Sequence, residues 1–364
     1  MKTIILERLL LVNITSDNND NPYLIFESLN NKGEELTQAD LVRNYIFMKL
    51  PLQERDEVYN NKWLPLEQSF KSNMNNKEYA GELTNAFWFY LRKDGMAVNE
   101  KEVYKAIKKR FDDLKCTDEL KLELENILKF SNYYLRLNFY KEEPEPKLKE
   151  RFRRLKRLDF TTCHIFLLNI YSHYEEKNLS LKDFEKILQY LESYFVRRWL
   201  VEVPTRTLGI VFNNLYNQVK QTNPHNLVSG LHTVLVNFDK SQRYPDDAEF
   251  RQALINKSLY SKGANDRVKL LLESIEASLN RELVDPKNLN IEHILPQSLT
   301  KEWKVMLGDS YTNIHKEWLH TLGNLTLTGY NPELSNKPFE EKLSLFKNSN
   351  VALNKYYQVK KVDI

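Results

Sequence analysis

The spacing of apolar residues divides this chain into two unequal parts. From residue 52 to 285, apolar residues recur every three or four positions, the spacing that places side chains on one face of an α-helix. Beyond Asp285-Pro286, residues 289–295 and 322–328 are typical of short strands and 338–346 of a helix. Glycine (9) and proline (12) are scarce, so few positions interrupt helices. We expect a mainly α fold with small α+β parts, ending in a β–β–α unit.

The predicted helices share an apolar stripe and are separated by polar or proline-containing breaks. They cover 83–91, 101–114, 121–139, 160–171, 181–200, 207–219 and 268–280. Ahead of them, residues 4–14 indicate a strand and 23–30 a short helix. Thr37 and Asp40 have the spacing of a capping box, which opens a helix that ends before Pro51.

Length and composition limit the kind of protein. A chain of 364 residues exceeds one average domain, and we expect three parts, 1–50, 51–285 and 286–364. The net charge of +3 permits nucleic-acid binding without predicting it. Two cysteines in no CxxC pair exclude a zinc-stapled core and favour a reducing compartment. Without a signal-peptide pattern or a stretch of ~20 apolar residues, we expect a cytoplasmic protein with no membrane partner.

The reactive side chains of the C-terminal part fall in three short blocks. They are Asn-Ile-Glu-His-Ile-Leu-Pro-Gln (290–297), Leu-Gly-Asn-Leu-Thr-Leu-Thr (322–328) and Asn-Pro-Glu-Leu-Ser-Asn-Lys-Pro-Phe (331–339). A neutral histidine can take a proton from water near pH 7, and carboxylate and amide oxygens suit a hard cation such as Mg²⁺. Taken singly, an Asn in such a block is usually a turn residue or an N-cap. Together, the three blocks supply the parts of a one-metal phosphodiesterase.

These blocks resemble the HNH (ββα-metal) nuclease superfamily, in particular its DUF1524 branch. The pattern Glu-His-Ile-x-Pro-Gln, Gly-Asn-Leu-Thr-Leu and Asn-x-x-x-Ser-Asn-x-x-Phe stands at 292–297, 323–327 and 331–339. The resemblance implies His293 as general base and Asn324 as the residue that braces the loop. It implies Glu292, also part of the catalytic set, and Asn336 as ligands of Mg²⁺ or Mn²⁺. Asn331 flanks the same turn and is the alternative to Asn336.

The front of the chain resembles a second domain of the same proteins. Ile-Phe-Glu-Ser-Leu-Asn-Asn-Lys-Gly (25–33) and the segment 36–45 are similar to the later part of DUF262, the ParB-like domain of GmrSD-type restriction proteins. The segments 194–198 and 244–250 resemble the helical region that joins the two domains. The family's Asp-Gly-Gln-Gln-Arg motif, associated with nucleotide use, does not occur in the sequence. Either the chain is a truncated or split member, with the motif on a separate DUF262 subunit, or NTP-dependent control has been lost.

The densest basic run lies at 147–157, on a predicted helix with seven basic residues and one acidic residue. We expect phosphate contacts from basic side chains there and from one in the third block. They are Arg151, Arg153, Arg154, Arg157 and Lys337. The alternative is a solvated helix face whose positive charge balances the acidic residues at 142–145. His315 and His320 fall between the two predicted strands, where we expect a loop.

These observations and the resemblance favour a metal-dependent HNH DNA endonuclease of a prokaryotic, modification-dependent restriction system. The alternative is a non-catalytic DNA-binding or regulatory subunit of a split complex, and RNA is the alternative substrate. The His293, Asn324 and Asn336 set favours the enzyme, whereas the missing nucleotide motif favours the subunit.

Overall fold

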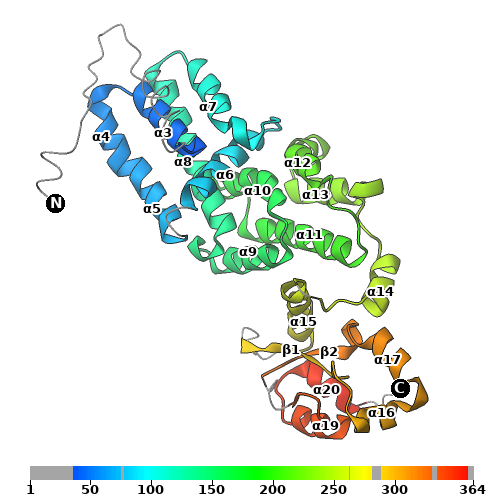
Figure 1. Ribbon diagram of the computed structural model, residues 1–364. Helices are drawn as coiled ribbons and strands as arrows, with labels where there is room; N and C mark the ends of the chain where they lie inside the picture. Colours follow the sequence, from blue (N-terminus) through cyan, green and yellow to red (C-terminus); the bar gives the residue numbers. More distant parts are fainter. Residues whose placement is uncertain (1–35, 75–77, 262, 281–287, 330–333, 360–364) are drawn as a thin grey trace, which may run out of the picture. The chain divides into compact units, whose positions relative to one another are not determined.

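Helices dominate the parts of the chain that the structure describes. The computed structural model describes residues 36–74, 78–261, 263–280, 288–329 and 334–359. These belong to two compact units, Met1–Leu135 and Arg136–Ile364. A two-stranded antiparallel sheet lies near the C-terminus (Figure 1). The prediction of a mainly helical fold with a small β part is confirmed. The predicted strand at 4–14 and helix at 23–30 lie outside the described residues.

The described residues of the first unit form five main helices. They are α3 (Gln38–Lys49), α5 (Leu64–Ser72), α6 (Tyr79–Arg92), α7 (Val103–Asp112) and α8 (Thr117–Asn138), whose last turn crosses the unit boundary; short helical segments at Leu52–Glu54, Arg55–Val58 and Tyr59–Trp63 join α3 to α5. The predicted capping box is confirmed. The Thr37 hydroxyl accepts from Asp40 N, and the Asp40 carboxylate accepts from Thr37 N. This pairing satisfies amides that the first helical turn leaves open.

The second unit begins with seven helices. They are α9 (Pro146–Leu158), α10 (His164–Glu175), α11 (Leu181–Leu200), α12 (Leu208–Thr222), α13 (Leu227–Val236), α14 (Asp247–Asn256) and α15 (Asn265–Leu279). Pro146 starts α9, where a missing N–H costs nothing, and the Glu145 side chain accepts from Lys147 N. Asp159 ends the helix with φ 61°. The prediction of a helix over 181–200 matches α11 at both ends.

The predicted β–β–α order is confirmed. Strand β1 (Asn290–His293) pairs antiparallel with β2 (Leu325–Thr328), so that Glu292 lies opposite Thr326 and His293 opposite Leu325. Helix α19 (Phe339–Lys347) follows, and then α20 (Ala352–Val359). Two helices that the sequence did not predict, α16 (Lys301–Leu307) and α17 (Tyr311–Trp318), stand between the strands. Both strands are shorter than predicted; Leu322–Asn324 forms a 3₁₀ turn instead of strand.

Helix α15 is an integral part of the C-terminal fold. Val268 and Leu272 on this helix pack with Leu325 and Leu327 of β2 in one buried apolar cluster. The Glu276 carboxylate accepts from the amides of residues 352 and 353, which are open donors at the start of α20. The sheet and α20 are therefore held against α15 by both apolar packing and helix capping.

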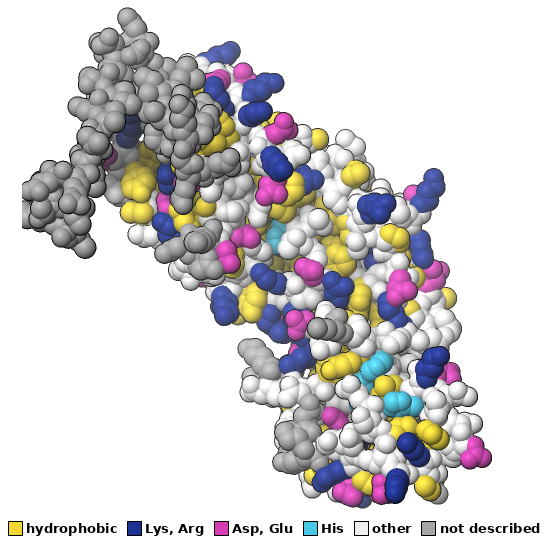
Figure 2. Space-filling model, in the orientation of Figure 1, with side chains coloured by type: hydrophobic (Ala, Val, Ile, Leu, Met, Phe, Trp, Pro, Cys, Tyr) yellow, Lys and Arg dark blue, Asp and Glu magenta, His cyan; other side chains and the backbone are white. Residues whose placement is uncertain are grey.

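Charges of both signs are interspersed on the molecular face that Figure 2 shows. Outside the grey area, Lys and Arg side chains are scattered among Asp and Glu, in keeping with a net charge of only +3. A binding partner that carries charge of one sign would therefore have to be recognised by a local cluster of opposite charge. None of the helices in the described ranges combines the length and apolarity needed to cross a membrane.

His164 makes the stability of the helical part depend on pH. Its side chain is 7% exposed, and burial lowers its pKa to about 3. The unfolded chain takes up a proton below pH about 6.5, whereas the native state does so only near the lower pKa, so stability falls as the pH drops through this window. Replacing His164 with Gln should flatten the dependence by about 1.4 kcal/mol per pH unit, measured by urea unfolding between pH about 6 and 4. The exposed His225→Gln is the control, and an equal slope in all three proteins would refute the assignment.

Candidate functional site

His293 is the last residue of β1, and its imidazole lies in a cluster of rings. Its Nε2 is 3.2 Å from Nδ1 of His320, and its ring meets the Tyr260 ring edge-on with centroids 4.5 Å apart. The side chain is 5% exposed. Burial, followed by the nearby His320 and Lys342, lowers the pKa of His293 to about 4. The imidazole is therefore neutral near pH 7 and able to accept a proton.

Asn324 fixes the chain where β1 ends. Its Oδ1 accepts from Leu295 N at 2.6 Å, and its Nδ2 donates to the carbonyls of Leu295 at 3.0 Å and Leu319 at 2.7 Å. The Asn324 carbonyl accepts from Ile294 N at 2.9 Å. The side chain thus braces the segment that follows His293 against the turn before β2. A catalytic role for Asn324 stays a prediction.

The Glu292 carboxylate lies away from His293, as expected of neighbouring residues in a strand. It accepts a hydrogen bond from Nζ of Lys342 on α19 at 2.7 Å, and the same ammonium donates to the His293 carbonyl at 2.7 Å. Lys342 is fully buried and Glu292 is 8% exposed. Burial raises the pKa of Glu292 and lowers that of Lys342, and the hydrogen bond between them opposes both shifts. The structure therefore gives Glu292 an internal partner.

The residues expected to hold a metal ion are not gathered at one point. Glu292 is paired with Lys342, and Asn336 lies exposed beside Ser335, whose φ is 35°. Asn331 lies outside the described residues. Across the described ranges, no group of three or more His, Cys, Asp or Glu is placed to hold a metal. In the arrangement shown, these donors do not fit a metal site, because a cation at Glu292 would have to take the place of the Lys342 ammonium.

The C-terminal part of the chain matches a known protein family. Residues 244–363 match the family described as GmrSD restriction endonucleases, C-terminal domain. The segment is a GmrSD C-terminal domain. It contains α14, α15, both strands and α19, and domains of this family are typically the nuclease part of restriction endonucleases. No curated protein and no solved structure matches the chain. The family implies DNA as substrate and a metal cofactor.

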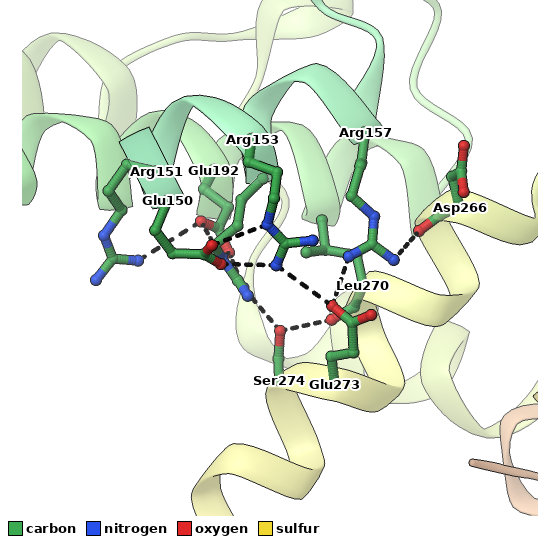
Figure 3. Close-up of polar contacts among 10 residues, drawn as sticks. Glu150, Arg151, Arg153, Arg157, Glu192, Asp266, Leu270, Glu273 and Ser274 are labelled. Carbon is green, nitrogen blue, oxygen red and sulfur yellow. Dashed lines mark hydrogen bonds and ion pairs between the residues drawn. The ribbon is translucent and has the colours of Figure 1, made fainter. Parts of the chain in front are cut away.

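The arginines of the basic run contact carboxylates within the protein (Figure 3). Arg154 forms a two-pronged contact with Glu192 of α11 and donates to Ser274 of α15 at 2.7 Å. Arg157 donates to Glu273 of α15. These bonds join α9 to α15. Strand β2 of the GmrSD domain packs against the same helix.

The remaining predicted DNA contacts differ in how firmly they are held. Arg153 donates to both oxygens of Glu150, at 2.8 and 2.7 Å. Arg151 lies 3.7 Å from Glu192, and Lys337 lies 3.7 Å from Glu341, both beyond hydrogen-bonding distance. Arg151 and Lys337 therefore have the weaker internal contacts. Of the acidic residues that the alternative interpretation paired with this run, Glu143 accepts from the Tyr171 hydroxyl and Glu145 accepts from Lys147 N.

Sequence reasoning missed two residues that contact the predicted catalytic set. Lys342 lies on the predicted last helix, but nothing in the sequence indicates that its ammonium is buried against a strand 50 residues earlier. His320 lies in a turn after α17, between the strands as predicted, but its contact with His293 was not foreseen. Its position beside the Gly323-Asn324 block was the one available signal. His315, also expected in a loop, lies instead in α17.

The Glu292–Lys342 pair should be decisive for the stability of the GmrSD domain. Lys342→Met leaves a buried carboxylate without its cation, which costs about 3–5 kcal/mol. The double variant Glu292→Gln, Lys342→Met removes both charges and should recover most of this loss. Urea unfolding followed by tryptophan fluorescence measures the free energy of unfolding in all three proteins, the wild type and the two variants. If the double variant is no more stable than Lys342→Met alone, charge compensation is not the source of the effect.

Proposed function

We propose that this protein is a metal-dependent DNA endonuclease of a prokaryotic, modification-dependent restriction system. Its GmrSD C-terminal domain, as an HNH (ββα-metal) fold, would hydrolyse phosphodiester bonds. One observation carries the proposal: a neutral, buried histidine ends the first strand of a β–β–α unit in a domain of a nuclease family. Asn324, which braces the same strand end, supports it.

In the proposed reaction, the His293 imidazole removes a proton from the attacking water. The water oxygen then bonds to phosphorus while the bond from phosphorus to the leaving oxygen breaks. Asn324 keeps the segment after His293 in place, and the Lys342 ammonium fixes the strand through the His293 carbonyl. A divalent cation, which Glu292 and Asn336 would hold only after the Lys342 ammonium left Glu292, would supply stabilisation of the charge on the scissile phosphate.

Mg²⁺ or Mn²⁺ is the proposed cofactor, with Glu292 and Asn336 as the proposed protein ligands. The exposed position of Asn336 leaves its amide oxygen accessible. Glu292 could join it only by exchanging Lys342 for the ion. Oxygen donors of this kind suit a hard cation that keeps several waters.

For DNA contacts, the observed pairings favour Arg151 and Lys337. Each lies 3.7 Å from its carboxylate partner. Either side chain could therefore bind a phosphate without breaking a close hydrogen bond. The other three arginines remain proposed contacts, but each is already hydrogen-bonded within the protein: Arg153, Arg154 and Arg157. To reach DNA they would have to leave Glu150, Glu192 and Glu273.

The internal pairing of Glu292 favours a second candidate function. If the Lys342 ammonium keeps the carboxylate, the chain would be a non-catalytic DNA-binding or regulatory subunit of a complex with a separate DUF262 polypeptide. Such a subunit would bind DNA and leave it intact under all metal conditions.

His293→Ala should abolish cleavage while the fold persists. Loss of a general base lowers the rate by roughly 10²–10⁴-fold. The measurement is conversion of supercoiled plasmid to nicked and linear forms in Mg²⁺ or Mn²⁺, with EDTA as the metal control and an RNA of matched sequence as the alternative substrate. Wild-type protein that leaves plasmid intact in both metals would favour the subunit. Equal nicking by His293→Ala would remove the base assignment.

DNA affinity should depend on salt through the two weakly paired cations. Arg151→Ala and Lys337→Ala should each lower the slope of log affinity against log salt by about 0.9, because each removes one phosphate contact. Arg157→Ala, whose guanidinium is held by Glu273, should leave the slope unchanged. Filter binding of a 30-base-pair duplex at several salt concentrations measures the slopes. An equal drop for Arg157→Ala would instead show that the arginine network opens on DNA.

A further inference from the structure

The imidazoles of His293 and His320 face each other through nitrogen atoms within hydrogen-bonding distance. Nε2 of His293 lies 3.2 Å from Nδ1 of His320. A neutral imidazole has one nitrogen that donates and one that accepts. At this distance, one ring donates to the other, and the choice fixes which nitrogen of His293 carries a lone pair.

The other edge of His293 indicates the direction of this bond. The Nδ1 atom lies 3.5 Å from Nε2 of Gln297, an exposed residue just beyond the strand. An amide nitrogen only donates, so the atom that it faces accepts. The Nδ1 edge is thus the edge beside exposed Gln297, whereas the Nε2 edge is turned toward His320. This arrangement places the hydrogen on Nε2 and the lone pair on Nδ1.

His320 is itself held firmly enough to orient a neighbour. Its carbonyl accepts from Leu259 N at 2.7 Å and from Tyr260 N at 3.3 Å, so its backbone is fixed to the segment before α15. Its ring stacks on that of Tyr260, with centroids 5.8 Å apart and planes 20° apart. Tyr260 also meets the His293 ring edge-on, so a single tyrosine holds both imidazoles in place.

We propose that His320 is the positioning residue of the site: it accepts the Nε2 hydrogen of His293 and so leaves Nδ1 of His293 to take the proton from water. This inference rests on the proposed role of His293 as base. It adds that Nδ1 is the atom that accepts the proton and that His320 determines this choice. When Nδ1 takes up the proton, His293 becomes an imidazolium with hydrogen on both nitrogens, and the Nε2–H donates more strongly to His320. His320 thus acts by orienting His293, without touching substrate.

Two substitutions at His320 separate hydrogen bonding from packing. The side-chain oxygen of Asn can stand where Nδ1 stands and accept the same hydrogen, whereas Ala offers no acceptor. His320→Ala should lower kcat by about 10–100-fold with KM nearly unchanged, as for other residues that orient a catalytic group. His320→Asn should recover most of that loss. The exposed His225→Ala is the control for loss of a histidine elsewhere in the chain.

The tautomer of His293 provides a readout that does not depend on cleavage. In protein labelled with ¹⁵N-histidine, the ring signals of His293 are those that vanish in His293→Ala. Wild type and His320→Asn should carry the proton on Nε2, whereas His320→Ala should show a mixture of tautomers. Full cleavage by His320→Ala, or an unchanged tautomer in it, would overturn the positioning role and leave the nuclease proposal intact. If wild-type protein fails to cleave, the proposed function fails, and the tautomer alone then upholds or overturns the role of His320.

Discussion

The buried ammonium of Lys342 is the contact on which the candidate site depends. From α19 it reaches both the Glu292 carboxylate and the His293 carbonyl, so one side chain ties the last helix of the β–β–α unit to the strand that ends in the base. Moving two charges out of water costs free energy. Removing only one partner of a buried ion pair strongly destabilises the protein, because the other charge is left buried without compensation. The pair therefore sets the position of His293 while it occupies the carboxylate that a metal would need. Lys342 and the proposed cofactor would therefore compete for Glu292.

A second constraint runs through α15, which belongs to two sets of contacts. One side of this helix carries Glu273 and Ser274, which pair with arginines of α9. The helix also packs against β2 and uses Glu276 to cap α20. Any change at the arginine run, including phosphate binding, therefore acts on a helix that supports the sheet. This is why the same arginines can stabilise the fold and still be candidates for a DNA-dependent rearrangement.

Local sequence signals predicted what local physics determines. The capping box at Thr37 and Asp40, helix α11 and the order of the two strands and α19 all follow from periodicity and capping. The contacts of Lys342 and His320 could not be read in this way, since they join residues 50 and 27 positions apart. The partners of the basic run were missed for the same reason. Charge density in a sequence does not reveal whether a carboxylate from a distant helix will meet it.

We propose that a water molecule, activated by His293, attacks the phosphorus of DNA. The most direct test is single-turnover cleavage of a duplex in ¹⁸O-labelled water with Mn²⁺, followed by mass spectrometry of the product ends. We predict one ¹⁸O atom in the newly formed terminal phosphate, and no such product from His293→Ala protein purified in the same way. Cleaved ends without ¹⁸O, or labelled ends formed equally by the His293 variant, would contradict hydrolysis at this site.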